Sequence, residues 1–291
     1  MIDSKTIAVT GASGQVGSAV LNQDSAVQSL SSRFDDDMDA VLAELHQISP
    51  KRLINAAAYT QVDRAEAEHQ TAFQINGDAL LALSNWCGAN NSELIHFSTD
   101  YVFNGQAKTA YLEHDAPDPI NVYGRSKLAG EQAIGQHHCR GLIIRTSWVL
   151  GSRGRNFVTT ILRAGLNRSR LQVVDDQWGR PTSAELLALV ARTVDIPTEQ
   201  TAQLMHLSDA GEPTTWFEIA RYALSRARDY GYTGIGASCV DPIKSSGYPT
   251  AARRPLNSLL DCSQFDRSVG LIRRPWQETV DRVVEQDVNN W

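Results

Sequence analysis

The sequence is poor in cysteine, and its four cysteines lie far apart along 291 residues. Cys87, Cys139, Cys239 and Cys262 form no Cys-x-x-Cys pair. Scattered cysteines of this kind are typical of isolated thiols in a reducing compartment. We therefore do not expect a disulfide framework.

The sequence also lacks an uncharged apolar run close to the roughly 20 residues needed to cross a bilayer. Its first residues lead almost at once into an apolar segment, so we expect no signal peptide. The 27 Lys and Arg residues are outnumbered by 33 Asp and Glu residues, which gives a net charge of −6. We expect a soluble, cytoplasmic protein without general affinity for nucleic acid or membranes. An anionic substrate would need basic side chains gathered at its own site.

Short apolar segments alternate with amphipathic segments in the first half of the chain. The apolar segments are rich in β-branched residues, as buried parallel strands are, and comprise residues 6–10, 52–55, 93–97 and 141–145. A further, short strand is expected at residues 26–30. The segments between them carry apolar residues at helical intervals, at 39–47, 71–89 and 124–134. This alternation predicts an α/β fold of the Rossmann type with a doubly wound parallel sheet.

The pattern changes after about residue 150. A loop rich in glycine and arginine is followed by predicted helices at 156–166 and 184–194, and by strands at 171–174 and 204–207. We expect residues 1–150, together with about 182–210, to form the dinucleotide-binding domain. About 151–181 and 211–260 would form a smaller, discontinuous substrate lobe, followed by a C-terminal segment at 261–291. The active site is then expected in the cleft between the two lobes.

The segment from Thr10 to Gly17 (TGASGQVG) follows a predicted strand and opens a predicted helix. Its three glycines permit a tight turn and a close approach of backbone to a pyrophosphate. The start of the helix adds N–H groups and partial positive charge. We predict cofactor contacts from this loop, and from the small residues after the third strand, at Gly11, Ser13, Gly14, Gln15, Val16, Gly17, Ala56, Ala57 and Ala58. A purely structural turn with tight helix–sheet packing is the alternative.

The choice between NADPH and NADH depends on the end of the second strand. Ser31, Ser32 and Arg33 stand there, and an arginine suits the 2′-phosphate of NADPH. Three aspartates follow at once, and a solvated loop residue is the alternative interpretation of Arg33. We predict NADPH as the preferred cofactor, with NADH as the second candidate.

Tyr123 and Lys127 lie four residues apart, and Thr99 lies upstream. In a helix this spacing places the phenol and the ammonium on one face. A nearby cation would lower the pKa of the phenol, which makes it a usable proton donor. The hydroxyl of Thr99 could hold a carbonyl oxygen against it. A single Tyr–Lys pair is usually an accident of a solvated helix, but together with the glycine loop it indicates a hydride-transfer enzyme.

These motifs, with others, resemble the extended short-chain dehydrogenases/reductases, and within them the dTDP-4-dehydrorhamnose reductase family. The resemblance covers nearly the whole chain in order. The glycine loop and the YxxxK pair mark only the superfamily. The more specific segments are 55–63 (NAAAYTQVD), 97–105 (FSTDYVFNG), 121–131 (NVYGRSKLAGE), 145–149 (RTSWV), 174–182 (VDDQWGRPT), 248–255 (YPTAARRP) and 257–261 (NSLLD).

The resemblance implies NADPH-dependent reduction of the 4-keto group of dTDP-4-dehydro-L-rhamnose to dTDP-L-rhamnose. Tyr123 would donate the proton, Lys127 would hold the cofactor ribose and lower the pKa of the tyrosine, and Thr99 would orient the carbonyl. Residues matched to positions near the sugar and the nicotinamide are Thr60, Val62, Asp100, Tyr101 and Trp148. Those matched to the nucleotide-sugar side of the cleft are Asn156, Gln177 and Arg254. Several have a plain structural alternative: Trp148 and Tyr101 as packing residues, Asp100 as a turn cap and Arg254 as a surface residue.

We predict no metal site. Neighbouring residues such as His137, His138 and Cys139 cannot readily converge on one ion in a regular element. His96 and His206 are interpreted as structural histidines. The family can place an acid at Glu185 near a dimer contact and pair it with a second acid after the glycine loop. This chain has Ala19 there, so a homodimer stays an open question.

Three functional hypotheses remain from the sequence. The first is the reductase above. The second is a sibling enzyme on the same fold, another nucleotide-sugar reductase or an epimerase, because the same Tyr and Lys serve both directions of hydride transfer. The third is a non-catalytic, dinucleotide-binding regulatory subunit, like the regulatory subunit of methionine adenosyltransferase. Net consumption of reduced cofactor separates the first from an epimerase, and any turnover excludes a pure regulator.

Overall fold

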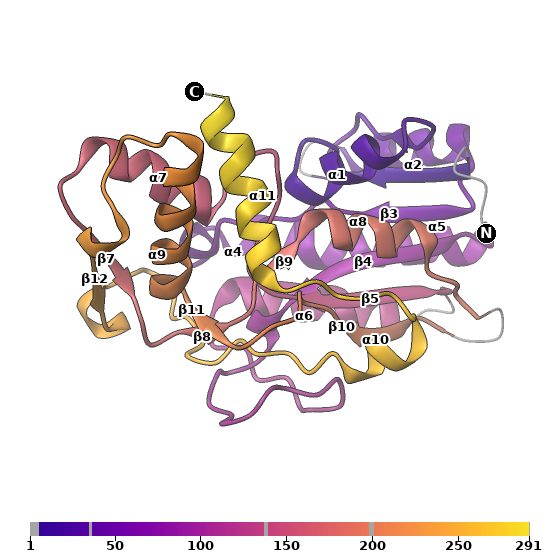
Figure 1. Cartoon of the computed structure of the whole chain (residues 1–291). Coiled ribbons are helices and arrows are strands. Elements are labelled where there is room, and N and C mark those ends of the chain that lie inside the picture. The colour runs from indigo at the N-terminus through magenta and orange to yellow at the C-terminus, as the bar shows by residue number, and fades with distance from the viewer. Residues whose placement is uncertain (1–5, 35–36, 137–138, 198–200, 291) are drawn as a thin grey trace.

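The computed structural model describes residues 6–34, 37–136, 139–197 and 201–290. His137 and His138, considered above as metal ligands, lie outside the described residues. Figure 1 shows a sheet flanked by helices and, on the left, a smaller group of helices and short strands around α7 and α9. The C-terminal helix α11 (Trp276–Asn289) runs between the two groups.

The main sheet has six parallel strands in the order β10-β5-β4-β3-β1-β2. They are β10 (Gln203–His206), β5 (Gly141–Thr146), β4 (Glu93–Thr99), β3 (Arg52–Asn55), β1 (Ile7–Thr10) and β2 (Gln28–Ser29). The predicted doubly wound fold and the addition of the 204–207 strand to the main sheet are both confirmed. From β1 the chain first moves outward to β2 and then crosses to β3 on the other side. Ligands of such sheets bind at the carboxyl ends of the strands near this switch point.

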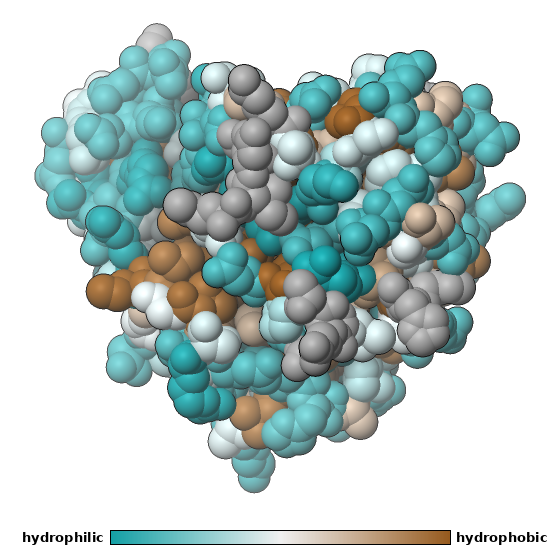
Figure 2. Space-filling model, turned by 90° about the vertical axis from the view of Figure 1, so that its right-hand side faces the viewer, coloured by the Kyte–Doolittle hydropathy of each residue, from teal (hydrophilic) through white to brown (hydrophobic). Residues whose placement is uncertain are grey.

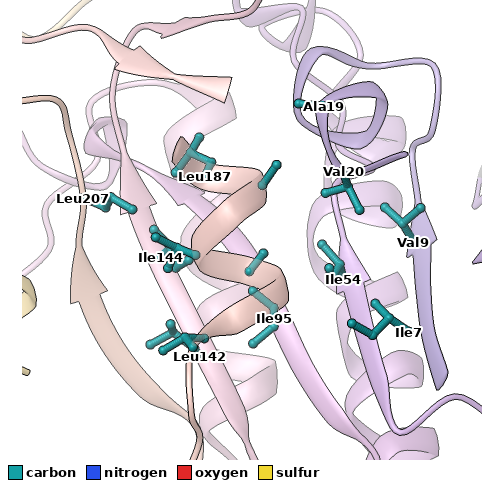
Figure 3. Packing of buried hydrophobic residues seen from close by; sticks show 14 of the residues in the cluster. Ile7, Val9, Ala19, Val20, Ile54, Ile95, Leu142, Ile144, Leu187 and Leu207 are labelled. Carbon is teal, nitrogen blue, oxygen red and sulfur yellow. The ribbon is translucent and has the colours of Figure 1, made fainter. Parts of the chain in front are cut away.

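Helices cover both faces of the sheet because successive strand residues point to opposite sides. Ile7, Val9 and Ile54 pack against α1 (Gln15–Gln23) and α8 (Ala184–Thr193), as Figure 3 shows. Ala8 and Leu53 face the opposite way. The helices on that side are α2 (Met38–Ile48), α5 (Ala79–Ala89) and α6 (Val122–Gly135). The strands therefore read as continuous apolar runs, as buried parallel strands do.

The helix expected at residues 71–89 is interrupted. α4 (His69–Phe73) is joined to α5 by one π-helical turn, η2 (Gln74–Asp78), and a four-residue helix, α3 (Val62–Ala65), precedes it. In the π turn, the side chain of Asn76 bonds the backbone of Tyr59 and the hydroxyl of Ser126. A Cβ at Gly130 of α6 would overlap the Asn76 carbonyl oxygen. The interruption thus accompanies a close approach between η2 and α6, which carries Tyr123 and Lys127.

The smaller lobe is built from pieces that are far apart in sequence. Its core combines apolar residues of α7 (Phe157–Asn167), α9 (Trp216–Ala227) and α11. Three two-stranded pairs accompany it: β7 (Leu171–Val174) with β12 (Val240–Ile243), β8 (Trp178–Gly179) with β11 (Thr214–Thr215), and β6 (Val149–Leu150) with β9 (Thr182–Ser183). The remaining short elements are η4 (Arg228–Tyr230), η5 (Ala237–Cys239), η6 (Ser245–Gly247) and α10 (Ser263–Ser268).

The C-terminal segment contributes to one core of the main sheet and to the core of the smaller lobe. Phe265 of α10 packs in the core between the sheet and helices α1 and α8. Trp276, Val280 and Val284 of α11 pack in the core of the smaller lobe. The sequence-based division into domains stays a proposal. The side of the molecule away from the smaller lobe is mostly hydrophilic (Figure 2). None of the described helices is both long and apolar enough to cross a membrane.

Candidate active site

The three predicted catalytic residues come together at the carboxyl end of β4. Thr99 is the last residue of β4 and the N-cap of η3 (Asp100–Val102). Tyr123 and Lys127 lie on the first turns of α6, whose N-cap is Asn121. The Asn121 side chain accepts a hydrogen bond from Gly124 N (2.7 Å) and donates one to the carbonyl of Arg253 (2.8 Å). A Cβ at Gly124 would overlap the Tyr101 carbonyl oxygen, so only glycine lets α6 approach η3 this closely.

The surroundings of Tyr123 correct one expectation from the sequence. Burial and the nearby Asp100 raise the pKa of Tyr123 to about 12, and a hydrogen bond with Thr99 offsets this only in part. Lys127 was expected to lower this pKa, but it does not contribute to the shift. The reason is geometric, because the lysine amine bonds other groups. Tyr123 therefore keeps its proton at neutral pH in the ligand-free protein.

Lys127 is buried, with 2% of its surface exposed. Its Nζ donates to the carbonyl of Phe97 (2.6 Å) and lies 3.1 Å from Nε2 of His96. Burial lowers the pKa of Lys127 to about 7, although Glu131 acts in the opposite direction. That carboxylate bonds Arg145 and Ser98, so it is not a direct partner of the lysine.

Asp100 and Tyr101 continue the site on η3. Asp100 is buried and accepts a hydrogen bond from the Thr99 hydroxyl (3.0 Å). Burial raises the pKa of Asp100 to about 6. The ring of Tyr101 meets that of Tyr123 edge-on, with centroids 5.7 Å apart. Burial also raises the pKa of Tyr101 well above its usual value.

The glycine loop lies directly against the segment that follows β3. Gly11 has φ +68°, and a Cβ there would come within 2.5 Å of Ala57 N. A Cβ at Gly17 would overlap the carbonyl oxygen of Gly11. α1 begins after Gly14 without a side-chain cap, so its first N–H groups are not taken by a side chain. Of the other predicted residues, Ser13 is exposed, while Val16, Ala56 and Ala58 are half-buried.

Gln15, the first residue of α1, also bonds a segment far away in the sequence. Its side chain donates to the carbonyl of Val149 (3.3 Å) and accepts from Gly151 N (2.7 Å). These bonds tie the glycine loop to the segment that leaves the main sheet.

Arg33 is exposed and lies just beyond β2. The carboxylate of Glu44 on α2 accepts from Ser31 N (2.8 Å), Ser32 N (3.0 Å) and the Ser31 hydroxyl. An acidic group therefore stands at the end of β2, but it comes from a helix 12 residues after Ser32.

A cleft of about 830 Å³ opens beside Tyr101. Three predicted substrate residues line it, namely Tyr101, Gln177 and Arg254. Its other walls come from α7, β7, the start of α9 and the chain from Ser245 to Leu256. Thr60, Val62, Asp100, Trp148 and Asn156 are not among the residues that line it.

Two of the lining residues are held by polar partners. The Arg254 guanidinium pairs with the Asp63 carboxylate at 2.7 Å and 3.1 Å, and this bond contributes to lowering the pKa of Asp63. Gln177 donates to the hydroxyl of Ser245 (3.0 Å). Arg254 therefore lies in an ion pair within the cleft wall, not on a free surface loop.

Trp148 and Asn156 have clear structural tasks. Trp148 stacks on Trp216, with centroids 3.9 Å apart, and has a left-handed backbone (φ +49°) that is strained for a bulky residue. A Cβ at Gly179 would meet its indole ring. Asn156 caps α7, accepting from Thr159 N and donating to the Gly151 carbonyl. Their substrate roles stay predictions.

The sequence reasoning missed several residues of the site. Asp63, Phe157 and Trp216 gave no signal because nothing in their local pattern points toward a cleft. His96 was interpreted as structural, yet it contacts the amine of Lys127. Its position on the same strand as Thr99 was the available hint. Among the described residues, no group of three or more His, Cys, Asp or Glu side chains is arranged to hold a metal.

Comparisons with known proteins agree with this geometry. The family model described as the RmlD substrate binding domain matches residues 5–289. A dTDP-4-dehydrorhamnose reductase of Sinorhizobium fredii is 37% identical over 289 residues, covering 96% of each chain, and that of Shigella flexneri is 39% identical over 251 residues, covering 85% of this chain and 83% of its own.

Among solved structures, a dTDP-4-dehydrorhamnose reductase of Bacillus anthracis in complex with NADP superposes with a TM-score of 0.85. It is 31% identical, and the match covers 95% of this chain and 97% of the other. The family model matches nearly every residue, and these relatives are more than 30% identical over most of their length. The chain belongs to the RmlD substrate binding domain family.

Proposed function

We propose that the protein reduces the 4-keto group of dTDP-4-dehydro-L-rhamnose to dTDP-L-rhamnose, with NADPH as the reductant and NADH as the second candidate. The observation that carries the proposal is the meeting of Thr99, Tyr123 and Lys127 at the carboxyl end of β4, in a chain that the family model matches from residue 5 to 289. The relatives named as dTDP-4-dehydrorhamnose reductases support an NAD(P)H-dependent oxidoreductase.

The residues present fit a dinucleotide at the glycine loop. Gly11 and Gly17 leave no room for a side chain, and α1 starts without a side-chain cap. Ala56, Ala57 and Ala58 follow β3 with small side chains beside this loop. A reduced nicotinamide bound here would supply the hydride for the carbonyl carbon. The complex of the Bacillus anthracis relative with NADP supports the choice of NADPH.

The chain's own residues would supply the proton and the orientation. Tyr123 holds its proton at neutral pH, because its pKa is about 12, and gives it to the substrate oxygen. Thr99 borders the phenol and would fix the same oxygen by a hydrogen bond. Lys127 would bond the cofactor ribose and so help to place the nicotinamide beside the carbonyl carbon.

The cleft beside Tyr101 would hold the nucleotide sugar. Arg253 and Arg254 both line it and could bond the diphosphate, so an acidic protein would have basic groups where they are needed. Phe157, Trp216 and Tyr248 supply apolar surface to the same cleft. The substrate contacts of Thr60, Val62, Asp100, Trp148 and Asn156, which do not line this cleft, stay predictions.

Purified protein should oxidise NADPH when dTDP-4-dehydro-L-rhamnose is generated in situ, and dTDP-rhamnose should appear in the same amount. NADH and a different 4-keto sugar nucleotide run alongside. Oxidation only with the other sugar would move the assignment to a sibling reductase. Binding of dinucleotide without net oxidation would favour an epimerase or, in the absence of all turnover, a regulatory subunit.

Two further expectations stay proposals. The scattered cysteines favour a cytoplasmic location. The homodimer that the sequence left open is the second, and sedimentation of the purified protein would decide the assembly state.

A further inference from the structure

Four buried polar residues form a continuous chain of hydrogen bonds behind the candidate active site. The Thr10 hydroxyl donates to Oδ1 of Asn55 (2.6 Å), and Nδ2 of Asn55 lies 3.0 Å from Nδ1 of His96. Nε2 of His96 lies 3.1 Å from Nζ of Lys127. Each of the four residues is at most 2% exposed.

The sheet register explains why these side chains meet. Thr10 is paired with Asn55 across β1 and β3, and Asn55 with His96 across β3 and β4. Residues in register on neighbouring parallel strands point to the same face, and this face is the one covered by α6. The row lies at the carboxyl ends of the strands, immediately before the glycine loop, before Ala56 and three residues before Thr99.

The charge state of His96 limits what the chain can do. Burial and the nearby Lys127 hold the pKa of His96 well below its usual value, so the imidazole is neutral. When Asn55 donates to Nδ1, the ring proton is on Nε2 and is donated to an uncharged Lys127. When the Asn55 amide presents its oxygen instead, Nδ1 is protonated and Nε2 accepts from a Lys127 ammonium.

This row of hydrogen bonds therefore offers Lys127 a partner whether its amine is neutral or protonated. Lys127 needs one besides the Phe97 carbonyl, because no carboxylate among the described residues bonds it: Glu131, on its own helix, bonds Arg145 of β5. Apart from His96, the titratable group whose charge acts on the pKa of Lys127 is Glu131. An unpartnered amine in this buried position would be costly and would lose its fixed place.

We propose that His96 is a positioning residue for the reaction put forward above. Oriented by Asn55 and Thr10, its imidazole holds Nζ of Lys127 beside the Phe97 carbonyl in both charge states. The remaining direction of Nζ is left for the ribose of a bound dinucleotide. The inference rests on the proposed function, because it assigns His96 as the partner of Lys127 in that reaction.

Two amide substitutions at His96 separate positioning from simple packing. In His96→Gln, the amide can occupy the place of Nε2 and keep the bond to Lys127. In His96→Asn, it occupies the place of Nδ1 and keeps only the bond to Asn55. We expect His96→Asn to lower kcat about tenfold or more through misplacement of the amine, with an almost unchanged KM for the sugar. His96→Gln should stay within about threefold of the wild type in kcat.

A binding measurement without sugar keeps this test separate from the identity of the substrate. The dissociation constant of NADPH, from fluorescence, should rise about fivefold or more in His96→Asn and should stay near the wild-type value in His96→Gln, since the loss of one hydrogen bond of ordinary strength weakens binding by roughly that factor. If wild-type protein binds NADPH but does not reduce the sugar, the proposed function fails while the comparison of the two variants still decides the role of His96.

The matched control is His206, a second fully buried histidine, which bonds the Tyr111 carbonyl and not Lys127. The Gln and Asn variants of His206 should not differ in kcat or in NADPH binding. If His96→Asn does not fold, Thr10→Val removes the far end of the chain with little change in volume and should lower kcat in the same direction. Equal effects of Gln and Asn at His96, or none from Thr10→Val in folded protein, would overturn the proposal.

Discussion

At the scale of single residues, Tyr123 must keep its proton until a carbonyl oxygen can receive it. The burial and the Asp100 carboxylate that raise the pKa of Tyr123 meet this requirement in the ligand-free protein. We expect Tyr123→Phe to reduce turnover at least about 100-fold, because only the proton donor is lost. NADPH should still bind, as fluorescence titration would show. Turnover similar to the wild type would sink the assignment of Tyr123.

Cofactor choice is a second property of single residues. Glu44 bonds the backbone at Ser31 and Ser32, where it would face a 2′-phosphate. Replacing it in Glu44→Gln should raise the affinity for NADPH relative to NADH about fivefold, because removing one repulsive charge contact in water changes the free energy by roughly 1 kcal/mol. Both dissociation constants can be measured by titration without sugar. An unchanged ratio would exclude Glu44 as a selector.

Arg33 supplies the opposite charge in the same region. Arg33→Asp should shift preference from NADPH toward NADH, since an aspartate opposes a 2′-phosphate and can accept from a ribose hydroxyl. The ratio of kcat/KM for the two cofactors is the measurement. If that ratio stays constant, Arg33 does not contact the phosphate.

At the scale of elements, Arg52 of β3 joins a strand to a helix. Its guanidinium bonds Glu93 of β4 and three carbonyls at the end of α8, those of Ala191 and Arg192 in the helix and of the C-cap Val194. Removing one partner of a buried ion pair costs about 3 kcal/mol or more. Arg52→Met should therefore lower the free energy of unfolding by about that amount in urea denaturation.

An exposed ion pair offers the control for this prediction. Arg64 pairs with Glu68 on the surface, and 61% of the Arg64 side chain is exposed. Arg64→Met should cost less than about 1 kcal/mol. If the two variants lose the same free energy of unfolding, the buried bonds of Arg52 stabilise the protein no more than an exposed ion pair does.

The sequence was most informative about elements whose pattern is local. The strands, the glycine loop and α6 follow from apolar runs, from three glycines and from the Tyr123–Lys127 spacing. The π turn at Gln74–Asp78 was missed because it accompanies a close contact with α6, which no local pattern contains. The bonds of Lys127 were missed for the same reason: Thr10, Asn55 and His96 lie on three separate strands and meet only through the register of the sheet.

At the scale of the whole molecule, Asp209 connects the two lobes. It accepts from Ser183 N at the start of α8 and from the hydroxyl of Thr279 on α11. Burial raises the pKa of Asp209 to about 6, although these bonds act against the shift. Between the unfolded pKa near 4 and this value, the native protein binds more protons than the unfolded chain, so this group makes stability fall as pH rises.

Asp209→Asn should remove that dependence. Relative to the wild type, the variant should gain about 2–3 kcal/mol of stability between pH 4 and pH 7, measured by denaturant unfolding at each pH. Shifts from other groups, such as the lowered pKa of His206, are common to both proteins and cancel in the difference. A difference that does not change with pH would contradict the assignment.

The lobes themselves were only partly predictable. A change of pattern near residue 150 indicated a second unit, but a local pattern cannot say that α11 would return to pack on α7 and α9. The cleft residues Phe157, Trp216 and Tyr248 come from three segments that are far apart in the sequence. In the sequence they cannot be distinguished from ordinary core residues, because only the folded structure places them in one cleft.

The stacked indoles of Trp148 and Trp216 have an optical consequence. Trp148 stands where the chain leaves the main sheet, and Trp216 begins a helix of the smaller lobe. Two chromophores in van der Waals contact share their excited states, so the folded protein should give an exciton signal in circular dichroism that a single indole cannot produce. Its loss on unfolding, or its change when a ligand enters the neighbouring cleft, would report on the junction of the lobes without any added label.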